Sequence, residues 1–267
     1  MSWTKNYIEK KATQRIPTPV LDAAGKALIE GINRAVENRW DRAIAAAAEA
    51  PGTTPRQKVK SISSPIRKNL TALGAAAGAT AAAPGVGTSV AIGTLAAELG
   101  VVALKITDMV MAIGAAHGHT DATVDERRAW VLAVLAFGDD AAQEFTTLAR
   151  DLGISMDGPA LDIANEAIVG GGGQMATIDA LRRINSTLVT QVLKKWGTRR
   201  GAATVGKLLP FGIGAAVGGS ANFFMIREFS KQADRFFRGY DREFVLGITH
   251  PSPDERAAAI DVDAHRI

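Results

Sequence analysis

The chain has 267 residues, enough for one or two domains with a sizeable core, and its lack of cysteine excludes disulfides, thiol chemistry and thiolate metal sites. Hydrophobic residues make up 47% of the chain but aromatic residues only 6%, and the abundant alanine favours helices over strands. The net charge of +4 and the sequence pI near 9.4 suit an anionic partner, although a solvated surface with a few surplus lysines also accounts for them.

The N-terminal part predicts two helices separated by prolines. Residues 1–15 carry charges in place of the apolar core of a signal peptide, so we expect a short basic helix and a cytoplasmic location. Apolar residues then recur at helical spacing from Val20 to Ala50, which predicts one long amphipathic helix. The expected organisation is an N-terminal basic helix over 1–19, a helical domain over 20–240 and a polar tail over 241–267.

The most informative segment has no charged residue from Asn69 to Ala97. Pro84-Gly85-Val86-Gly87 divides it, which predicts a helix, a tight turn and a second helix that ends near Ala116. Spaced glycines place small residues on a helix face and let neighbouring backbones approach closely; they are Gly74, Gly78, Gly93 and Gly100. A basic cluster precedes this segment, formed by Arg56, Lys58, Lys60, Arg67 and Lys68.

The C-terminal half continues the helical pattern. A capping box at Thr123 predicts a helix through Leu135, a short helix is expected over 138–152, and further helices over 159–169 and 174–196. A second charge-free stretch, Leu208 to Ile226, repeats the Pro/Gly turn and is followed by a Phe-rich helix. A second basic cluster precedes it, formed by Arg199, Arg200 and Lys207. Since no segment alternates with the period of a strand, we predict an all-α fold, a single compact multi-helix bundle with Gly/Ala-rich apolar helical hairpins in its core.

The two charge-free stretches leave three interpretations open. A membrane-spanning helix needs about 20 mostly apolar residues, and both stretches are interrupted by proline and glycine. They are core helices of a soluble bundle, hairpins that dip into a bilayer, or true spans. The flanking basic residues favour hairpins at a bilayer over a wholly structural role, because each Lys or Arg near an anionic leaflet contributes about 1 kcal/mol.

The sequence carries no signature of catalysis. HExxH and GxSxG are absent, and the Gly-rich turns lack the preceding strand and the lysine of a phosphate loop. His117 and His119 are expected to be surface histidines of a loop. The candidate polar site is Glu98, Lys105 and Asp108 on one side of an apolar helix, either as an internal ion pair that sets helix register or as a polar site facing a groove. We expect neither a cofactor nor a metal.

Two separated sets of motifs resemble the EcsC protein family. The first set comprises Gly74, Gly78, Pro84-Gly85-Val86-Gly87, Glu98-Leu99, His117-Gly118-His119 and Glu126-Arg127-Arg128-Ala129-Trp130-Val131-Leu132. The second comprises Leu209-Pro210-Phe211-Gly212, Gly218-Gly219, Asn222, Ala233 and Phe236-Phe237. Glu98-Leu99-Gly100 and the histidines around Gly118 depart from the family pattern of Asp-Ile/Leu-Pro and aromatic residues. The resemblance covers about 20–240 and implies a bacterial helical protein, cytoplasmic or membrane-associated, from a family named for a component encoded with an ABC transporter; it carries over no catalytic residue.

We therefore expect a non-enzymatic, peripheral membrane-associated protein or an accessory protein of a membrane complex. It contacts an anionic membrane surface or a membrane protein complex on the inner face of the cell membrane, through the two basic clusters. Two alternatives stay open: a hydrolase-like or lipid-binding protein with a polar pocket around Glu98, Lys105 and Asp108, and a soluble helical scaffold that binds a protein partner in an apolar groove. Nucleic acid is not expected, because the basic clusters lack interleaved aromatic residues and nucleic-acid-binding motifs.

Overall fold

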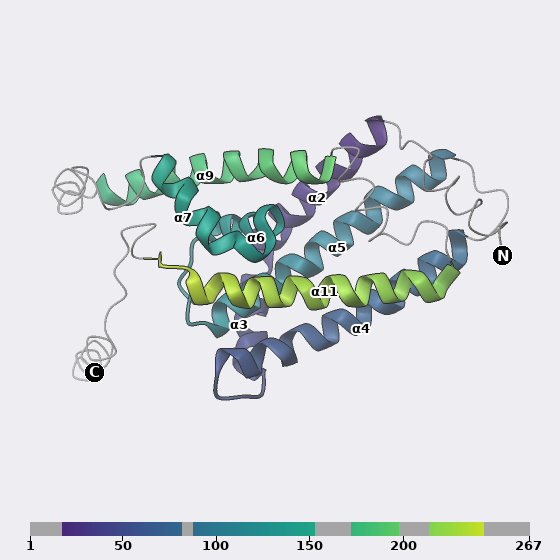
Figure 1. Ribbon diagram of the computed structural model, residues 1–267, viewed down its shortest axis with the longest axis horizontal. Coiled ribbons are helices and arrows are strands. Elements are labelled where there is room, and N and C mark those ends of the chain that lie inside the picture. The colour runs from purple at the N-terminus through teal and green to yellow at the C-terminus, as the bar shows by residue number, and fades with distance from the viewer. Residues whose placement is uncertain (1–17, 82–87, 153–171, 198–213, 243–267) are drawn as a thin grey trace.

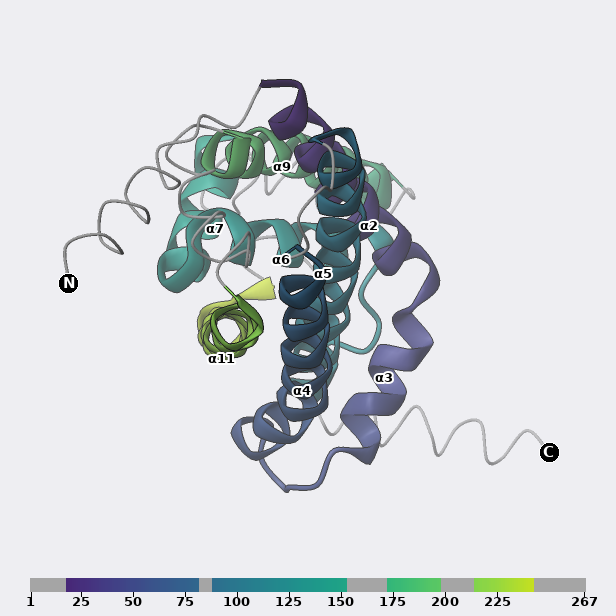
Figure 2. The same cartoon turned by 90° about the vertical axis from the view of Figure 1, so that its right-hand side faces the viewer.

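The computed structural model describes residues 18–81, 88–152, 172–197 and 214–242, and places side chains over 25–72, 100–152, 179–195 and 223–242. These ranges form helices and no strand, which confirms the all-α prediction. The helices pack against one another in one bundle (Figure 1 and Figure 2). The helices expected over 1–15 and 159–169, the turns at Pro84 and Pro210, and the tail beyond residue 242 lie outside the described residues.

The prediction of one long helix over 20–50 is wrong. The chain forms two helices there, α2 (Thr18–Asn38) and α3 (Trp40–Glu49), and Arg39 separates them with φ −127° and ψ 13°. Both helices pack on α5 (Thr88–Ala116), and Arg39 forms an ion pair with Asp108 of α5. The break at Arg39 lets the chain change direction while the apolar sides of both helices stay in contact with α5.

α4 (Pro55–Ala81) begins before the charge-free stretch and includes the first basic cluster. Pro55 occupies its first position, where the missing N–H has no partner within the helix in any case. Gln57 caps the N-terminal end of the helix, because its Oε1 accepts a hydrogen bond from the backbone N–H of Thr53 at 2.9 Å. α4 and α5 are the helices predicted on either side of Pro84, and α5 ends at Ala116 as expected.

α6 (Val124–Phe137) begins at the predicted capping residue. Thr123 Oγ1 accepts from the backbone N–H of Glu126 at 3.3 Å. Gly138 ends the helix with φ 65°, a left-handed conformation that glycine adopts without strain, and starts the short 3-10 helix η1 (Gly138–Asp140). α7 (Ala141–Asp151) follows, and α9 (Gly172–Gly197) packs on α6. The helices predicted over 138–152 and 174–196 are thus confirmed within a few residues.

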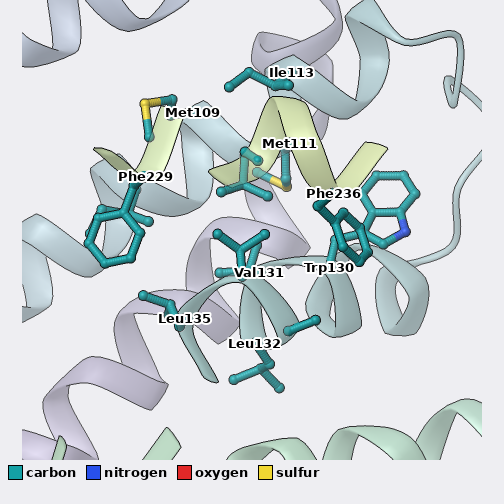
Figure 3. Close-up of a cluster of buried hydrophobic side chains, with 14 of the residues drawn as sticks. Met109, Met111, Ile113, Trp130, Val131, Leu132, Leu135, Phe229 and Phe236 are labelled. Atoms are coloured by element: carbon teal, nitrogen blue, oxygen red, sulfur yellow. The ribbon is translucent and has the colours of Figure 1, made fainter. Parts of the chain in front are cut away.

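α6 lies in the centre of the core. Every side chain from Ala129 to Leu135 is buried, so the helix is covered on all sides rather than along one stripe. Figure 3 shows its side chains meeting those of α5 and of α11 (Gly214–Gly239); those labelled are Met109, Met111, Ile113, Trp130, Val131, Leu132, Leu135, Phe229 and Phe236. Full burial of a side chain of this size contributes about 1.5–3 kcal/mol, so this cluster supplies much of the free energy of folding.

Close approach of α2 to α5 depends on Gly31. A Cβ built on Gly31 would lie 2.7 Å from the carbonyl oxygen of Gly100 and 3.0 Å from Cβ of Ala103. Because the first of these is a backbone atom, it cannot move aside cheaply. A Cβ on Gly100 would lie 3.8 Å from the Ala27 carbonyl oxygen, an ordinary contact. The glycine that this crossing requires is therefore Gly31, and not Gly100, one of the glycines from which close helix approach was predicted.

The helices α4, α5 and α11 all extend to one end of the molecule (Figure 1). α11 packs along α4, and α5 contacts both. Figure 1 shows the C-terminal end of α4 and the N-terminal end of α11 side by side on the right of the view, with the N-terminal end of α5 above them, on the side where α2 begins. The two charge-free stretches of the sequence therefore meet in space, although more than 100 residues of chain separate them.

Candidate functional site

Asp108 of the predicted polar site is bound on both carboxylate oxygens by Arg39. Arg39 Nε donates to Oδ1 at 2.6 Å and Nη2 donates to Oδ2 at 2.7 Å. The Asp108 side chain is only 13% exposed and that of Arg39 22%. Such a two-point, charge-assisted pair satisfies the carboxylate and fixes its orientation. Asp108 thus joins α5 to the junction of α2 and α3.

The other two residues of the predicted polar site take different positions. Lys105 is half-buried one turn before Asp108 on α5. Glu98 lies two turns before Lys105 on the same helix, and the structure describes its backbone but not its side chain. The structure therefore brings Asp108 together with Arg39, a residue that the sequence analysis did not consider because it lies 69 positions away.

The prediction that His117 and His119 are surface histidines is wrong. His119 is 8% exposed and the His117 side chain 9%. Gly118, with φ 98°, turns the chain after α5, and both imidazole rings pack against Phe237 with centroids 5.7 Å apart. His117 Nε2 lies 3.2 Å from Asp234 Oδ1, and burial lowers the pKa of His117 by more than Asp234 raises it.

A buried ion pair lies beside these histidines, between the start of α6 and the end of the described chain. Arg242 donates from Nε and Nη2 to the two oxygens of Glu126 at 2.7 Å and 2.9 Å, and from Nη1 to Asp121. Tyr240 Oη also donates to Glu126, at 3.2 Å. Burial raises the pKa of Tyr240 well above its usual range, and the charge of Glu126 raises it further. Burial lowers the pKa of Arg242, but its bonds to Glu126 and Asp121 outweigh this and raise it overall.

This polar cluster has the properties of a structural element. It consists of His117, Asp121, Glu126, Asp234, Tyr240 and Arg242. Its carboxylates already accept hydrogen bonds from neighbouring side chains, whereas a general base needs an oxygen within reach of a substrate proton. Within the described ranges, no group of three or more His, Asp and Glu side chains is placed to hold a metal. Sequence reasoning missed the cluster because Arg242 and Glu126 are 116 positions apart.

The first predicted basic cluster lies entirely on α4, a helix with no acidic residue. Lys58 is used inside the fold, since its Nζ donates to the carbonyl oxygen of Ala47 at 3.0 Å near the end of α3. Arg67 lies over the ring of Phe223 of α11 at 4.6 Å. The remaining members, Arg56, Lys60 and Lys68, are exposed. The second cluster, Arg199, Arg200 and Lys207, lies outside the described residues.

An exposed aromatic pair adjoins Arg67. Phe224 is 62% and Phe223 37% exposed, and their rings meet edge to face with centroids 5.6 Å apart. Lys68 and Arg227 are exposed within about one turn of these residues along α4 and α11. We name Arg67, Lys68, Phe223, Phe224 and Arg227 the aromatic–basic patch. Large apolar side chains exposed next to cations are typical of surfaces that meet a partner or a membrane.

Beyond this patch the three helices carry no charged residue. The charge-free ends are 69–81 of α4, 88–97 of α5 and 214–226 of α11, and we name them together the tip. Lys68, Glu98 and Arg227 are the first charged residues at its base. Val101, 43% exposed, lies within one turn of Glu98 on α5. The patch exposes aromatic and basic side chains, and the tip beyond it carries no charged residue, so the two together form the candidate functional site.

Within the part of the chain that the structure describes, no single helix combines the length and the apolar character needed to cross a bilayer.

No family model, curated protein or solved structure matches the chain. The resemblance to the EcsC family therefore stays a prediction.

Proposed function

We propose that this chain is a non-enzymatic protein that binds the surface of an anionic membrane, by itself or as an accessory of a membrane protein complex. The observation that carries the proposal is the exposed Phe224, which packs on Phe223 and lies one turn from Arg227, while Arg67 of α4 covers Phe223 at the base of the charge-free tip. An apolar side chain flanked by cations matches both parts of a membrane interface, the acyl boundary and the anionic head groups. The EcsC resemblance is compatible with this function, since it implies a helical protein that is cytoplasmic or membrane-associated.

The strength of such binding follows from the residues of the patch. Each cation near an anionic leaflet contributes about 1 kcal/mol, and full burial of a Phe side chain contributes about 1.5–3 kcal/mol. Arg67, Lys68, Arg227 and Phe224 therefore support binding that is reversible and sensitive to salt. At 1 M salt the screening length falls to about 3 Å, so the electrostatic part of this affinity is lost.

Flotation with lipid vesicles tests the proposal. The protein should float with phosphatidylserine-containing vesicles at low salt and much less with pure phosphatidylcholine vesicles, since only the former attract the cations. Phe224→Ser should weaken binding several-fold while leaving the melting temperature unchanged, because the ring is 62% exposed. Leu193→Ser on α9 is the matched control: Leu193 is 38% exposed and lies on another helix, so its removal should not affect flotation.

Two outcomes would contradict membrane binding. One is a protein that stays at the bottom of the gradient with anionic vesicles at low salt. The other is equal loss of flotation in Phe224→Ser and Leu193→Ser, which would mean that the patch is not the contact surface. Protein that fails to float but co-purifies with a soluble partner would favour the scaffold alternative instead.

A further inference from the structure

The tip has the length, the composition and the position to enter a bilayer. We infer that it enters the hydrocarbon of one leaflet end-on, with α4 and α11 steeply inclined to the membrane plane and with Lys68 and Arg227 at the level of the head groups. The occupant of this surface is lipid, and the inference rests on the proposed function. It adds a mode of binding that is distinct from lying flat on head groups.

The charge-free ends are long enough to cross one leaflet. About 13 residues of α4 follow Lys68 and about 13 of α11 precede Arg227, and each run spans about 20 Å of helix at 1.5 Å per residue. The hydrocarbon core of a bilayer is about 30 Å thick. A charge-free end of this length passes through one leaflet and stops short of the opposite head groups.

The charged boundaries of α4 and α11 lie within about one turn of each other. Arg67 of α4 contacts Phe223 of α11 at 4.6 Å, and Arg227 follows Phe223 by one turn. Both charge-free runs therefore start within about one turn of each other and extend in the same direction, as Figure 1 shows for the ends of α4 and α11. The start of α5 lies at the same end of the molecule. Aligned boundaries are what a common depth of insertion requires.

Hydrocarbon tolerates only segments whose backbone N–H and C=O groups are bonded internally, and a helix meets this condition in its interior but not over its first and last four residues. The described backbone of the tip is helical in α4, α5 and α11. Alanine and glycine insert less readily than leucine or phenylalanine, so Phe223, Phe224 and the cations at the base are needed to hold the tip at the interface.

The basic residues of α4 distinguish end-on from flat binding. Arg56, Lys60 and Arg67 share one face of the helix, and Lys60 and Arg56 lie about 10 Å and about 16 Å from Arg67 along its axis. In end-on binding these two residues are raised above the head groups by a screening length or more, which is about 10 Å at 0.1 M salt. In flat binding on this face they lie as close to the membrane as Arg67.

Two double variants with the same charge change test the orientation. Lys68→Gln with Arg227→Gln removes two exposed cations at the base of the tip, whereas Arg56→Gln with Lys60→Gln removes two exposed cations of α4 farther from the tip. We expect the first pair to weaken binding to anionic vesicles about tenfold or more and the second by less than about threefold. If the second pair weakened vesicle binding as much as the first, the protein would bind flat. That result would overturn the inference while leaving membrane binding intact.

Depth is measured directly with a fluorophore, and the lack of cysteine allows a single label. The environment-sensitive dye NBD is attached to Ala81→Cys at the end of α4, to Ala72→Cys near its base, and to Thr147→Cys on α7 as the control. In vesicles with acyl chains brominated at the 11,12 position, we expect strong quenching at position 81, weaker quenching at 72 and none at 147. Circular dichroism and thermal melting check that each labelled protein is folded.

The outcomes separate the two proposals. Vesicle-bound protein whose label at position 81 is no better quenched than the label at 147 contradicts insertion, while surface binding stands. Protein that does not associate with vesicles at all contradicts both.

Discussion

The guanidinium of Arg242 binds both oxygens of the Glu126 carboxylate, at 2.7 Å and 2.9 Å, although the two side chains are only 3% and 1% exposed. This pair fastens the chain that follows α11 to the first turn of α6. It also explains why Glu126 does not complete the capping box that the sequence predicts: its carboxylate is bound to Arg242 and Tyr240. α11 is thereby fixed at the end opposite the tip.

Removing one partner of this buried pair should strongly lower the free energy of unfolding. Arg242→Ala leaves the charge of Glu126 buried without its cation, which costs about 3–5 kcal/mol in comparable pairs. Urea unfolding followed by circular dichroism measures the change. Arg238→Ala is the control: Arg238 also pairs with an acid, Asp234, but is 56% exposed, so its loss should cost less than about 1 kcal/mol.

A double variant checks the cause of that loss. Glu126→Gln combined with Arg242→Met removes both charges, so it should be more stable than Arg242→Ala alone. If the double variant is no more stable than Arg242→Ala, the destabilisation comes from lost packing of Arg242 and not from the unpaired Glu126 carboxylate.

The Arg39–Asp108 pair should behave as a structural contact. Asp108→Asn keeps the shape of the side chain but removes its charge, and hydrogen bonds to charged groups are worth about 1.5–3 kcal/mol. We expect a loss of about 2 kcal/mol in the free energy of unfolding, with vesicle binding unchanged, because the pair lies away from the aromatic–basic patch. A variant of wild-type stability that no longer binds lipid would assign Asp108 a direct role and contradict the structural interpretation.

Local sequence signals predicted the helices well, whereas contacts between distant residues could not be predicted. Thr123 and Gly138 mark the ends of α6 by their own chemistry, so both boundaries followed from the sequence. The break at Arg39 did not, because the residues on either side continue the helical pattern and the partner, Asp108, lies 69 positions away. The burial of His119 could not be predicted for the same reason, because it depends on Phe237 and Tyr240, which are distant in the sequence.

The candidate site was predicted in composition but not in arrangement. The two charge-free stretches and the basic residues of α4 are visible in the sequence. That both stretches meet at one end, and that Arg67 lies against Phe223, depends on how α11 returns along α4. Lys58 shows the opposite case: its charge placed it in the basic cluster, but its bond to Ala47 gives it a role within the fold.

The crossing of α2 and α5 gives a prediction with an internal control. Gly31→Ala places a methyl group 2.7 Å from the carbonyl oxygen of Gly100, so the helices must move apart, at a cost of about 1–3 kcal/mol. Gly100→Ala adds the same group where the nearest atom is 3.8 Å away, and the better helix propensity of alanine should leave stability unchanged or raised by up to about 1 kcal/mol. Thermal unfolding of the two variants measures the difference, and equal effects would contradict the close approach.

The burial of His117 should make the protein less stable in mild acid. Its neighbours are Asp234, which favours the imidazolium, and Arg238, which disfavours it, but burial is the largest influence and the pKa lies below the ordinary value of 6.5. The unfolded chain therefore binds a proton at a pH where the folded chain does not. The free energy of unfolding consequently falls as the pH drops below about 6.5, whereas above that pH His117 no longer makes it depend on pH. His117→Gln removes the titrating group. Its stability should consequently fall less than that of the wild type between pH 7.5 and pH 5.5, measured by urea unfolding at each pH, whatever its absolute stability. Parallel losses in the two proteins would mean that His117 is as readily protonated in the folded chain as in the unfolded one.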